Sequence, residues 1–154
     1  MKTLGLSLLL LSPLALLGAD SDDKDRKAVE RAVMDYLEAL YDVNPDLIER
    51  SVHPDLTKFG FGRWGDAKEY RSFPMTFEQL HDLAGKWNAD GTKATDESPR
   101  KVEVLDLLDQ TASAKLTAEW GIDYMHLAKF EGEWKILHVM WQTHPPTVDA
   151  GYAR

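Results

Sequence analysis

Residues 120–141, WGIDYMHLAKFEGEWKILHVMW, contain two runs of strand-forming residues joined by Glu131–Gly132. β-branched and aromatic residues favour strands, and a short glycine-containing link is typical of a tight hairpin turn. The stretch therefore predicts two antiparallel strands, over 122–130 and 133–142. Four titratable side chains lie among the apolar ones: Asp123, Tyr124, His126 and His138. Whether they face a pocket or solvent bears on function.

The position of the turn predicts a register in which Met125 faces His138 and Asp123 faces Met140. Asp123 and His138 would then be diagonal neighbours on one face of the sheet, about 7–8 Å apart along the backbone. A carboxylate that orients an imidazole is an acid–base pair. The alternative is that Asp123 only satisfies a buried histidine, and a slip of one residue would exchange the two faces.

Both faces of this predicted hairpin are mostly apolar, whereas a sheet with one solvated face alternates more cleanly. Helices can cover one face. The other face would carry Tyr124 and His126, and it needs a partner, most simply a second copy of the chain. We therefore expect a homodimer through the outer face of the sheet.

Helices are expected before this sheet. Apolar residues recur at helical spacing from Val29 to Tyr41. Asn44 is a suitable N-cap and Pro45 a suitable first residue for a second, short helix. A third helix follows Thr76, which forms a capping-box pattern with Gln79.

The remaining strands are read from short apolar runs bounded by turn residues. Four successive strands joined by short turns predict an antiparallel meander, and helices on one face of it make an α+β domain. The glycine-rich stretch GFGRWG, residues 60–65, lies between two strands and is interpreted as a turn. The expected strands outside the hairpin cover residues 56–64, 67–73, 101–108 and 112–120.

The N-terminus has the pattern of a secretory signal peptide over residues 1–19. Lys2 precedes an apolar run, and the small residues Gly18 and Ala19 suit cleavage after Ala19. The alternative is an uncleaved membrane anchor, the only contact with a membrane that we expect. Cleavage would make the protein secreted or periplasmic in a bacterium.

The rest of the 154 residues predicts one domain. A polar lead-in at 20–26 precedes the domain at 27–144, and a loose tail is expected at 145–154. The formal charge is −8 and there is no cysteine. Without a basic stripe we expect no nucleic-acid partner. The histidines are scattered, and no HExxH or phosphate-loop motif is present, so we expect a pocket without metal or cofactor.

Three stretches resemble a known family: DYLEALYDVNPDLIERSVHPDLTKFGF (35–61), MTFEQLHDLAGKWN (75–88) and TASAKLTAEWGIDYMHLAKFEGEWKILHVMWQ (111–142). They resemble the nuclear transport factor 2-like superfamily and, within it, the "putative lumazine-binding" family. The resemblance covers nearly all of Lys27 to Gln142. It implies a cone-shaped α+β fold, with N-terminal helices packed on a strongly bent antiparallel sheet that encloses a pocket.

By position, the resemblance also implies a set of residues that line this pocket. Related isomerases use a tyrosine on the first helix and carboxylates in the pocket, which makes Tyr36, Asp123 and His138 the catalytic candidates. The six pocket residues implied are Tyr36, His53, Lys58, Trp64, Asp123 and His138.

Most of these residues also have a structural interpretation. Tyr36 lies on the apolar stripe of its helix, where a core tyrosine would bond a backbone carbonyl. His53 precedes Pro54 and could cap the helix end. Lys58 is either solvated or buried, and a buried lysine needs a partner or a shifted pKa. Trp64 is either a lid over the pocket mouth or a dimer contact.

Three functions are consistent with these residues. The first is an exported small-molecule-binding protein with an unknown ligand, for which the family name suggests a pteridine-like compound. The second is a cofactor-independent isomerase, dehydratase or cyclase, with Asp123 or His138 as the base and Tyr36 or Lys58 stabilising an oxyanion. The third is a protein-interaction module that uses the apolar sheet face.

Overall fold

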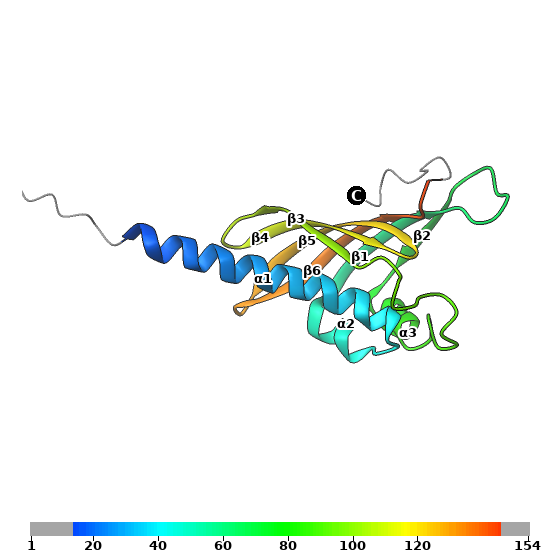
Figure 1. The fold of residues 1–154 in the computed structure, drawn as a ribbon, viewed down its shortest axis with the longest axis horizontal. Coiled ribbons are helices and arrows are strands. Elements are labelled where there is room, and N and C mark those ends of the chain that lie inside the picture. The colour runs from blue at the N-terminus through cyan, green and yellow to red at the C-terminus, as the bar shows by residue number, and fades with distance from the viewer. Residues whose placement is uncertain (1–13, 146–154) are drawn as a thin grey trace, which may run out of the picture.

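A computed structural model describes residues 14–145 of the chain (Figure 1). Most of the expected signal peptide (1–13) and most of the expected tail (146–154) lie outside the described residues. The elements are α1 (Leu14–Tyr41), α2 (Asp46–Ser51), β1 (Val52–Gly62), β2 (Arg71–Met75), α3 (Phe77–Ala84), β3 (Lys101–Leu107), β4 (Thr111–Ala118), β5 (Gly121–Phe130) and β6 (Glu133–Gln142).

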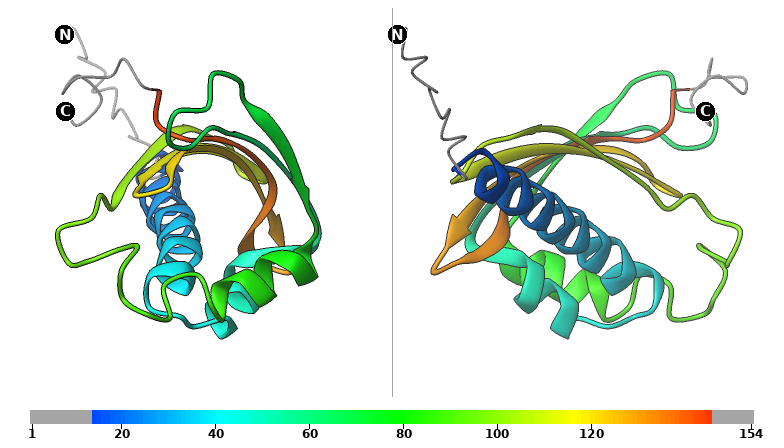
Figure 2. Two further views of the ribbon diagram at one scale, coloured as in Figure 1. Left: turned by 90° about the vertical axis from the view of Figure 1, so that its right-hand side faces the viewer. Right: turned by 60° about the vertical axis from the view of Figure 1, so that its left-hand side comes forward.

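The strands form a single six-stranded sheet in the order β2-β1-β6-β5-β4-β3. The predicted antiparallel meander of β3 to β6 is confirmed. β1 pairs with β6 in parallel, which the sequence pattern does not predict. The sheet curves around α1, and α2 and α3 lie at one end of the concave side (Figure 2). The expected α+β arrangement is therefore confirmed.

Helix α1 begins earlier than expected and contains the whole polar lead-in at 20–26. The Asp25 carboxylate accepts hydrogen bonds from Lys129 Nζ at 2.6 Å and from Trp134 Nε1 at 3.0 Å. These contacts attach this part of the helix to the β5–β6 hairpin. Among residues 14–145, no helix is both long and apolar enough to span a membrane.

The N-terminal caps of the shorter helices follow the sequence signals in one case only. The capping box of α3 is confirmed, since Thr76 accepts from the backbone N–H of Gln79 and the Gln79 side chain accepts from the N–H of Thr76. The expected Asn44 cap of α2 is wrong by one residue. Pro45 occupies the N-cap position, without a side-chain hydrogen bond. Val43 takes the positive φ that reverses the chain before it.

The β5–β6 hairpin turns at Glu131 and Gly132, as predicted, and both residues have positive φ. The predicted register holds from this turn as far as the pair Leu127–Ile136. Beyond that pair a β-bulge places Leu137 as an extra residue on β6, so that every later partner shifts by one.

The bulge overturns the predicted pairing farther along the hairpin. Met125 faces Val139 instead of His138, and Asp123 faces Trp141 instead of Met140. The residues of β6 after the bulge therefore lie on the faces opposite to those predicted. Val139 and Trp141 join the concave side, and His138 joins the outer side.

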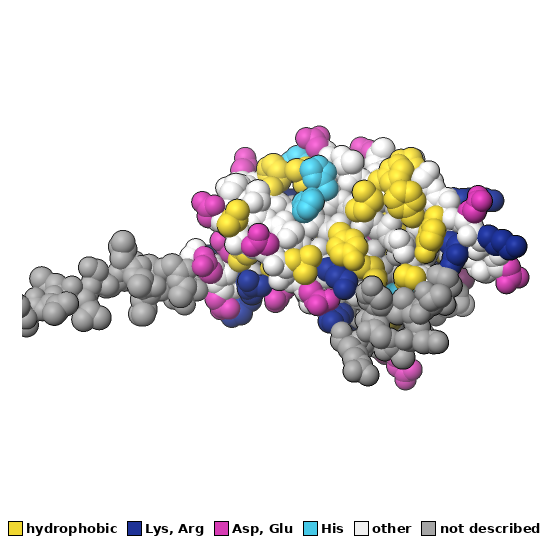
Figure 3. Space-filling view, turned by 90° about the horizontal axis from the view of Figure 1, so that it is seen from above, with side chains coloured by type: hydrophobic (Ala, Val, Ile, Leu, Met, Phe, Trp, Pro, Cys, Tyr) yellow, Lys and Arg dark blue, Asp and Glu magenta, His cyan; other side chains and the backbone are white. Residues whose placement is uncertain are grey.

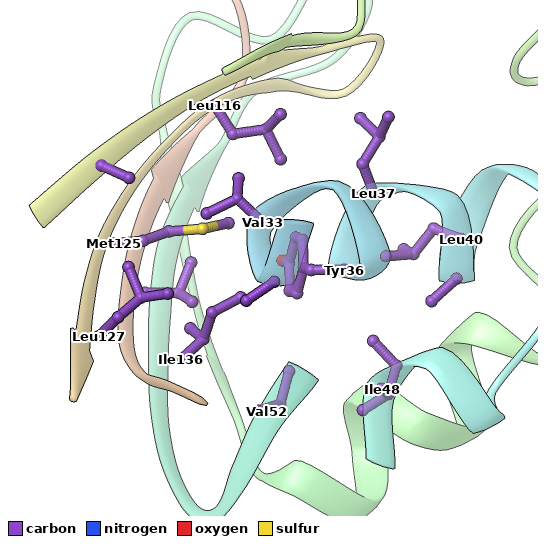
Figure 4. Packing of buried hydrophobic residues seen from close by; sticks show 14 of the residues in the cluster. Val33, Tyr36, Leu37, Leu40, Ile48, Val52, Leu116, Met125, Leu127 and Ile136 are labelled. Atoms are coloured by element: carbon purple, nitrogen blue, oxygen red, sulfur yellow. The ribbon is translucent and has the colours of Figure 1, made fainter. Parts of the chain in front are cut away.

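The hydrophobic core lies between α1 and the concave face of the sheet (Figure 4). Val33, Tyr36 and Leu37 of α1 are almost fully buried. Full burial of one large apolar side chain contributes about 1.5–3 kcal/mol. These buried side chains therefore account for much of the free energy that holds α1 against the sheet. Its main partners on the sheet are Leu116, Met125, Leu127 and Ile136.

Candidate functional site

A cavity of about 460 Å³ lies between the C-terminal half of α1, α3 and one end of the sheet. This volume lies within the range of small-molecule sites, about 300–1,000 Å³. The walls are apolar and strongly aromatic. They include four of the five tryptophans, Trp64, Trp87, Trp120 and Trp141, together with Leu40, Met75, Leu80 and Leu83.

The aromatic residues form two groups around the cavity. In the first, the Trp87 ring stacks on Tyr41 with 5.8 Å between centroids, and Trp120 meets both rings edge to face. In the second, Trp64 packs at 5.3 Å from Phe73 and 6.4 Å from Trp141. Flat aromatic surfaces of this kind suit a planar ligand, because aromatic rings favour offset and edge-to-face contacts.

Two glycines of β1 make room for these rings. A Cβ atom on Gly60 would fall 2.0 Å from Trp141 Nε1, and one on Gly62 would fall 2.0 Å from the ring of Trp64. The interpretation of GFGRWG as a turn is therefore wrong for its first half. Gly60 and Gly62 belong to the strand, and the chain reverses after them, over residues 63–70.

A chain of polar groups lies beside this apolar cavity. Lys58 Nζ lies 2.5 Å from the Tyr36 hydroxyl, and both side chains are buried. The Asp123 carboxylate lies close enough to the Tyr36 hydroxyl for its charge to raise the pKa of that phenol. Trp120 Nε1 donates to both oxygens of that carboxylate, at 3.1 and 3.2 Å. Lys58, Tyr36 and Trp120 line the cavity, whereas Asp123 lies behind them and is fully buried.

Burial shifts the ionisation of this group. Loss of water lowers the pKa of the Lys58 ammonium, and the nearby Asp123 charge opposes that shift. Burial likewise raises the pKa of Asp123. The charge of Lys58 and hydrogen bonding from Trp120 and Tyr36 lower this pKa, but the effect of burial is larger. The pKa of Tyr36 lies well above its ordinary value, because of burial and the Asp123 charge. Each shift favours the neutral form of the side chain.

Four of the six residues implied by the resemblance come together here. Tyr36, Lys58 and Trp64 line the cavity, and Asp123 lies immediately behind it. The alternative of a solvated Lys58 is wrong, since that residue is only 6% exposed. Trp64 is 58% exposed and lies at the rim.

The two histidines lie elsewhere. His138 is exposed on the outer face, directly opposite His126, so the predicted Asp123–His138 pair is wrong. The pairing was mispredicted because the bulge at Leu137 turns His138 to the opposite face of the sheet. His53 stacks on Phe130 at 4.1 Å, and its Nδ1 accepts from the backbone N–H of Asp55. It lines a separate surface hollow and does not belong to the aromatic cavity.

Several wall residues were not predicted. Trp87, Trp120 and Trp141 give most of the aromatic surface, and the only signal for them in the sequence is the concentration of tryptophan near the strand and helix ends. As to metals, no group of three or more His, Cys, Asp or Glu in the described part of the chain could hold an ion.

Comparison with known proteins supports the fold. The sequence profile of the family described as "Putative lumazine-binding" matches residues 24–142. The chain belongs to this family. Comparison with curated protein sequences gives no match.

Solved structures with the same fold are distant in sequence. A nuclear transport factor 2-like protein of unknown function from Shewanella baltica has a TM-score of 0.60 and 18% identity, covering 80% of this chain and 96% of its own. A second, from Methylobacillus flagellatus, has a TM-score of 0.58 and 20% identity, covering 79% and 94%. A structure described as a putative scytalone dehydratase from Novosphingobium aromaticivorans has a TM-score of 0.53 and 15% identity, covering 82% and 89%. The family member described here therefore has the nuclear transport factor 2-like cone fold.

Proposed function

We propose that this protein binds a compact, planar aromatic molecule that carries a carbonyl or carboxylate oxygen. The observation that carries this proposal is the buried Lys58 among aromatic walls. The Lys58 amine has two N–H donors when neutral and three when protonated, and Tyr36 is its only hydrogen-bond partner within residues 14–145. A ligand oxygen would satisfy the others. A pteridine, which the family name suggests, is one planar compound with such oxygens.

Trp141 adds a second donor to this argument. Its indole N–H is buried and has no hydrogen-bond partner among the described residues. A buried polar group without a partner costs about 1–3 kcal/mol, so a ligand oxygen that reached it would recover part of that free energy. Trp141 Nε1 lies against Gly60, however, so a ligand oxygen would reach it only if the indole ring moved. Lys58 is therefore the donor that favours an acceptor on the ligand rather than a wholly apolar molecule.

Filling the cavity tests whether it is the binding site. We would titrate the protein with 2-naphthamide and with lumazine in a calorimeter. Leu83→Trp, inside the cavity, should abolish binding, because the larger ring occupies the ligand's volume. Leu105→Trp is the matched control, since Leu105 is exposed and lies outside the cavity wall. Equal affinity in both variants, or no binding to the unaltered protein, would contradict the proposal.

A second candidate function is a cofactor-independent isomerase, dehydratase or cyclase. The chain from Tyr36 to Asp123 favours it, because Tyr36 could donate a hydrogen bond to a carbonyl oxygen while the carboxyl group behind it supplies or takes up a proton. Deuterium exchange at the methyl group of 2-acetonaphthone, followed by NMR, tests this function. Asp123→Asn should slow the exchange about 10²-fold or more while 2-naphthamide still binds.

We further propose that the protein forms a homodimer and that it is exported. The outer sheet face exposes Tyr124 and Met140, which are cross-strand partners and each 51% exposed. Figure 3 shows apolar patches spread over this face, with histidine side chains beside them. A second copy would cover them.

The proposal that the protein is exported is supported by the signal-peptide pattern of residues 1–19. The N-terminal sequence of protein recovered from the periplasm tests it.

A further inference from the structure

Lys58 combines two properties that seldom occur together. Its side chain is buried, at 6% exposure, yet it lines a cavity large enough for a small molecule. The walls around it are apolar and aromatic, and its Nζ lies 5.4 Å from the centre of the Trp141 ring. An amine attacks a carbonyl carbon only when it is unprotonated. Burial favours that form, since it lowers the pKa of Lys58.

A proton donor is in contact with this amine. The Tyr36 hydroxyl lies 2.5 Å from Lys58 Nζ. Burial and the Asp123 charge keep the pKa of Tyr36 well above its ordinary value, so the phenol holds its proton at neutral pH. Burial also raises the pKa of Asp123, and in its protonated form this carboxyl group can return a proton to Tyr36. The cavity therefore places a nucleophile next to a general acid.

We propose that Lys58 forms a Schiff base with an aromatic aldehyde or ketone that enters the cavity. The inference rests on the proposed function, because the same cavity must first take up an aromatic carbonyl compound. It goes further in assigning covalent chemistry to one residue. Lys93 lines the same cavity, but it is exposed and donates to the backbone carbonyl of Trp87, whereas the buried Lys58 contacts the Tyr36 hydroxyl.

The reaction needs no other reactant. The Nζ lone pair forms a bond to the carbonyl carbon, the C=O π electrons move to oxygen, and oxygen receives a proton from Tyr36. Nitrogen then loses a proton, which returns through Tyr36 and Asp123. In the second step Tyr36 protonates the hydroxyl group, which leaves as water while the C=N bond forms, and the iminium nitrogen then gives its proton back to Tyr36. The net change is amine plus carbonyl compound giving imine plus one water.

Reductive trapping tests the inference. The full protein would be treated with 2-naphthaldehyde and sodium cyanoborohydride at neutral pH, and the adduct located by peptide mass mapping. We expect one main adduct per chain, on Lys58. Lys58→Met and Lys58→Arg should lose it, because neither side chain offers a neutral amine. Lys86→Met is the control, since Lys86 is exposed on the loop after α3, and it should keep the adduct.

The pH dependence separates a reactive lysine from one that is merely accessible. The titratable groups around Lys58 are Tyr36 and Asp123, and Glu119 and Lys93 line the same cavity. Trapping at Lys58 should reach its plateau at a lower pH than trapping at exposed lysines. The same pH dependence for all lysines, or adducts spread over exposed lysines with none on Lys58, would overturn the inference.

A non-reactive ligand distinguishes failure of the inference from failure of the proposed function. The amide 2-naphthamide has the same ring and a carbonyl oxygen but does not form an imine. Binding of 2-naphthamide without an adduct from 2-naphthaldehyde would refute the Schiff base alone. Failure of both compounds to bind would refute the proposed function as well. The thermal unfolding midpoint of each variant shows whether a lost adduct reflects lost structure.

Discussion

The indole ring of Trp141 lies directly against the backbone of Gly60 on the neighbouring parallel strand. A methyl group at Gly60 would fall 2.0 Å from the indole nitrogen, well inside van der Waals contact. Gly60 and Trp141 are register partners of β1 and β6. This close approach sets the position of one aromatic wall, and with it the shape of the cavity beside Lys58.

Gly60→Ala should therefore destabilise the protein and weaken ligand binding. The added methyl group forces Trp141 to move, and overpacking of this kind costs about 1–3 kcal/mol. Urea unfolding measures the first effect and calorimetry with 2-naphthamide the second. Gly85→Ala is the control, because a Cβ there would meet only Asp82 O, at an ordinary 3.7 Å. Equal stabilities of the two variants would show that the contact is not rigid.

The contact of Asp25 with the hairpin should be visible in the pH dependence of stability. Hydrogen bonds from Lys129 and Trp134 lower the pKa of Asp25 below 3.8. The unfolded chain thus takes up this proton at a higher pH than the folded one. The stabilisation is present above the ordinary pKa and is lost as pH falls through the lowered value.

Asp25→Asn should cost about 1–2 kcal/mol at neutral pH, and the difference from the unaltered protein should shrink in acid. Urea unfolding at pH values on either side of 3.8 measures it. Asp82→Asn, an exposed change on α3, should have little effect at any of these pH values. A difference for Asp25→Asn that stays constant with pH would mean that its charge has no part in the contact.

Tyr36 and Lys58 should be energetically coupled. Tyr36→Phe leaves the buried Lys58 amine without a hydrogen-bond partner among the described residues, which costs about 1–3 kcal/mol. In the Lys58→Met background the same change should cost less, because no amine remains to be satisfied. A double-mutant cycle by urea unfolding measures this coupling.

Tyr41→Phe gives the matched control for this cycle. The Tyr41 hydroxyl donates to the carbonyl of Pro99 and accepts from the backbone N–H of Glu119, and neither bond involves Lys58. The losses of unfolding free energy caused by Tyr41→Phe and by Lys58→Met should therefore be additive. Additive costs for Tyr36 as well would argue against the buried hydrogen bond.

The outer sheet face should mediate association. Met140→Lys places a charge opposite Tyr124 in the middle of the exposed apolar surface, so it should convert a dimer to a monomer. Sedimentation velocity over a range of protein concentrations measures the change. Ala89→Lys, on the exposed loop after α3, should leave the dimer intact. If the unaltered protein is a monomer at every concentration, a different partner would have to cover this face.

The sequence predicted the fold better than the site, for local reasons. The Glu131–Gly132 turn and the Thr76 capping box depend on neighbouring residues, and both are present. The bulge at Leu137 was not predictable from the sequence. Because β5 and β6 carry apolar residues on both faces, their pattern fits equally well with or without a shift of one residue in the pairing. That slip misplaced His138.

Long-range packing explains the other differences. The parallel pairing of β1 with β6 joins segments distant in the chain, and no local pattern encodes it. Gly60 and Gly62 look like turn residues until the positions of Trp141 and Trp64 are known. Tyr36, Lys58 and Asp123 were nominated by resemblance, yet only the structure shows that they form one hydrogen-bonded and electrostatic group beside the cavity.

The most direct test is the effect of a ligand oxygen on affinity. Calorimetry would compare 2-naphthamide with 2-methylnaphthalene, in the unaltered protein and in Lys58→Met. We predict that the oxygen strengthens binding about tenfold or more in the unaltered protein, because a buried donor without a partner costs about 1–3 kcal/mol and the oxygen would satisfy it. The advantage should disappear in Lys58→Met. An equal preference for the amide in both proteins would contradict the assignment of Lys58 as the group that recognises the ligand.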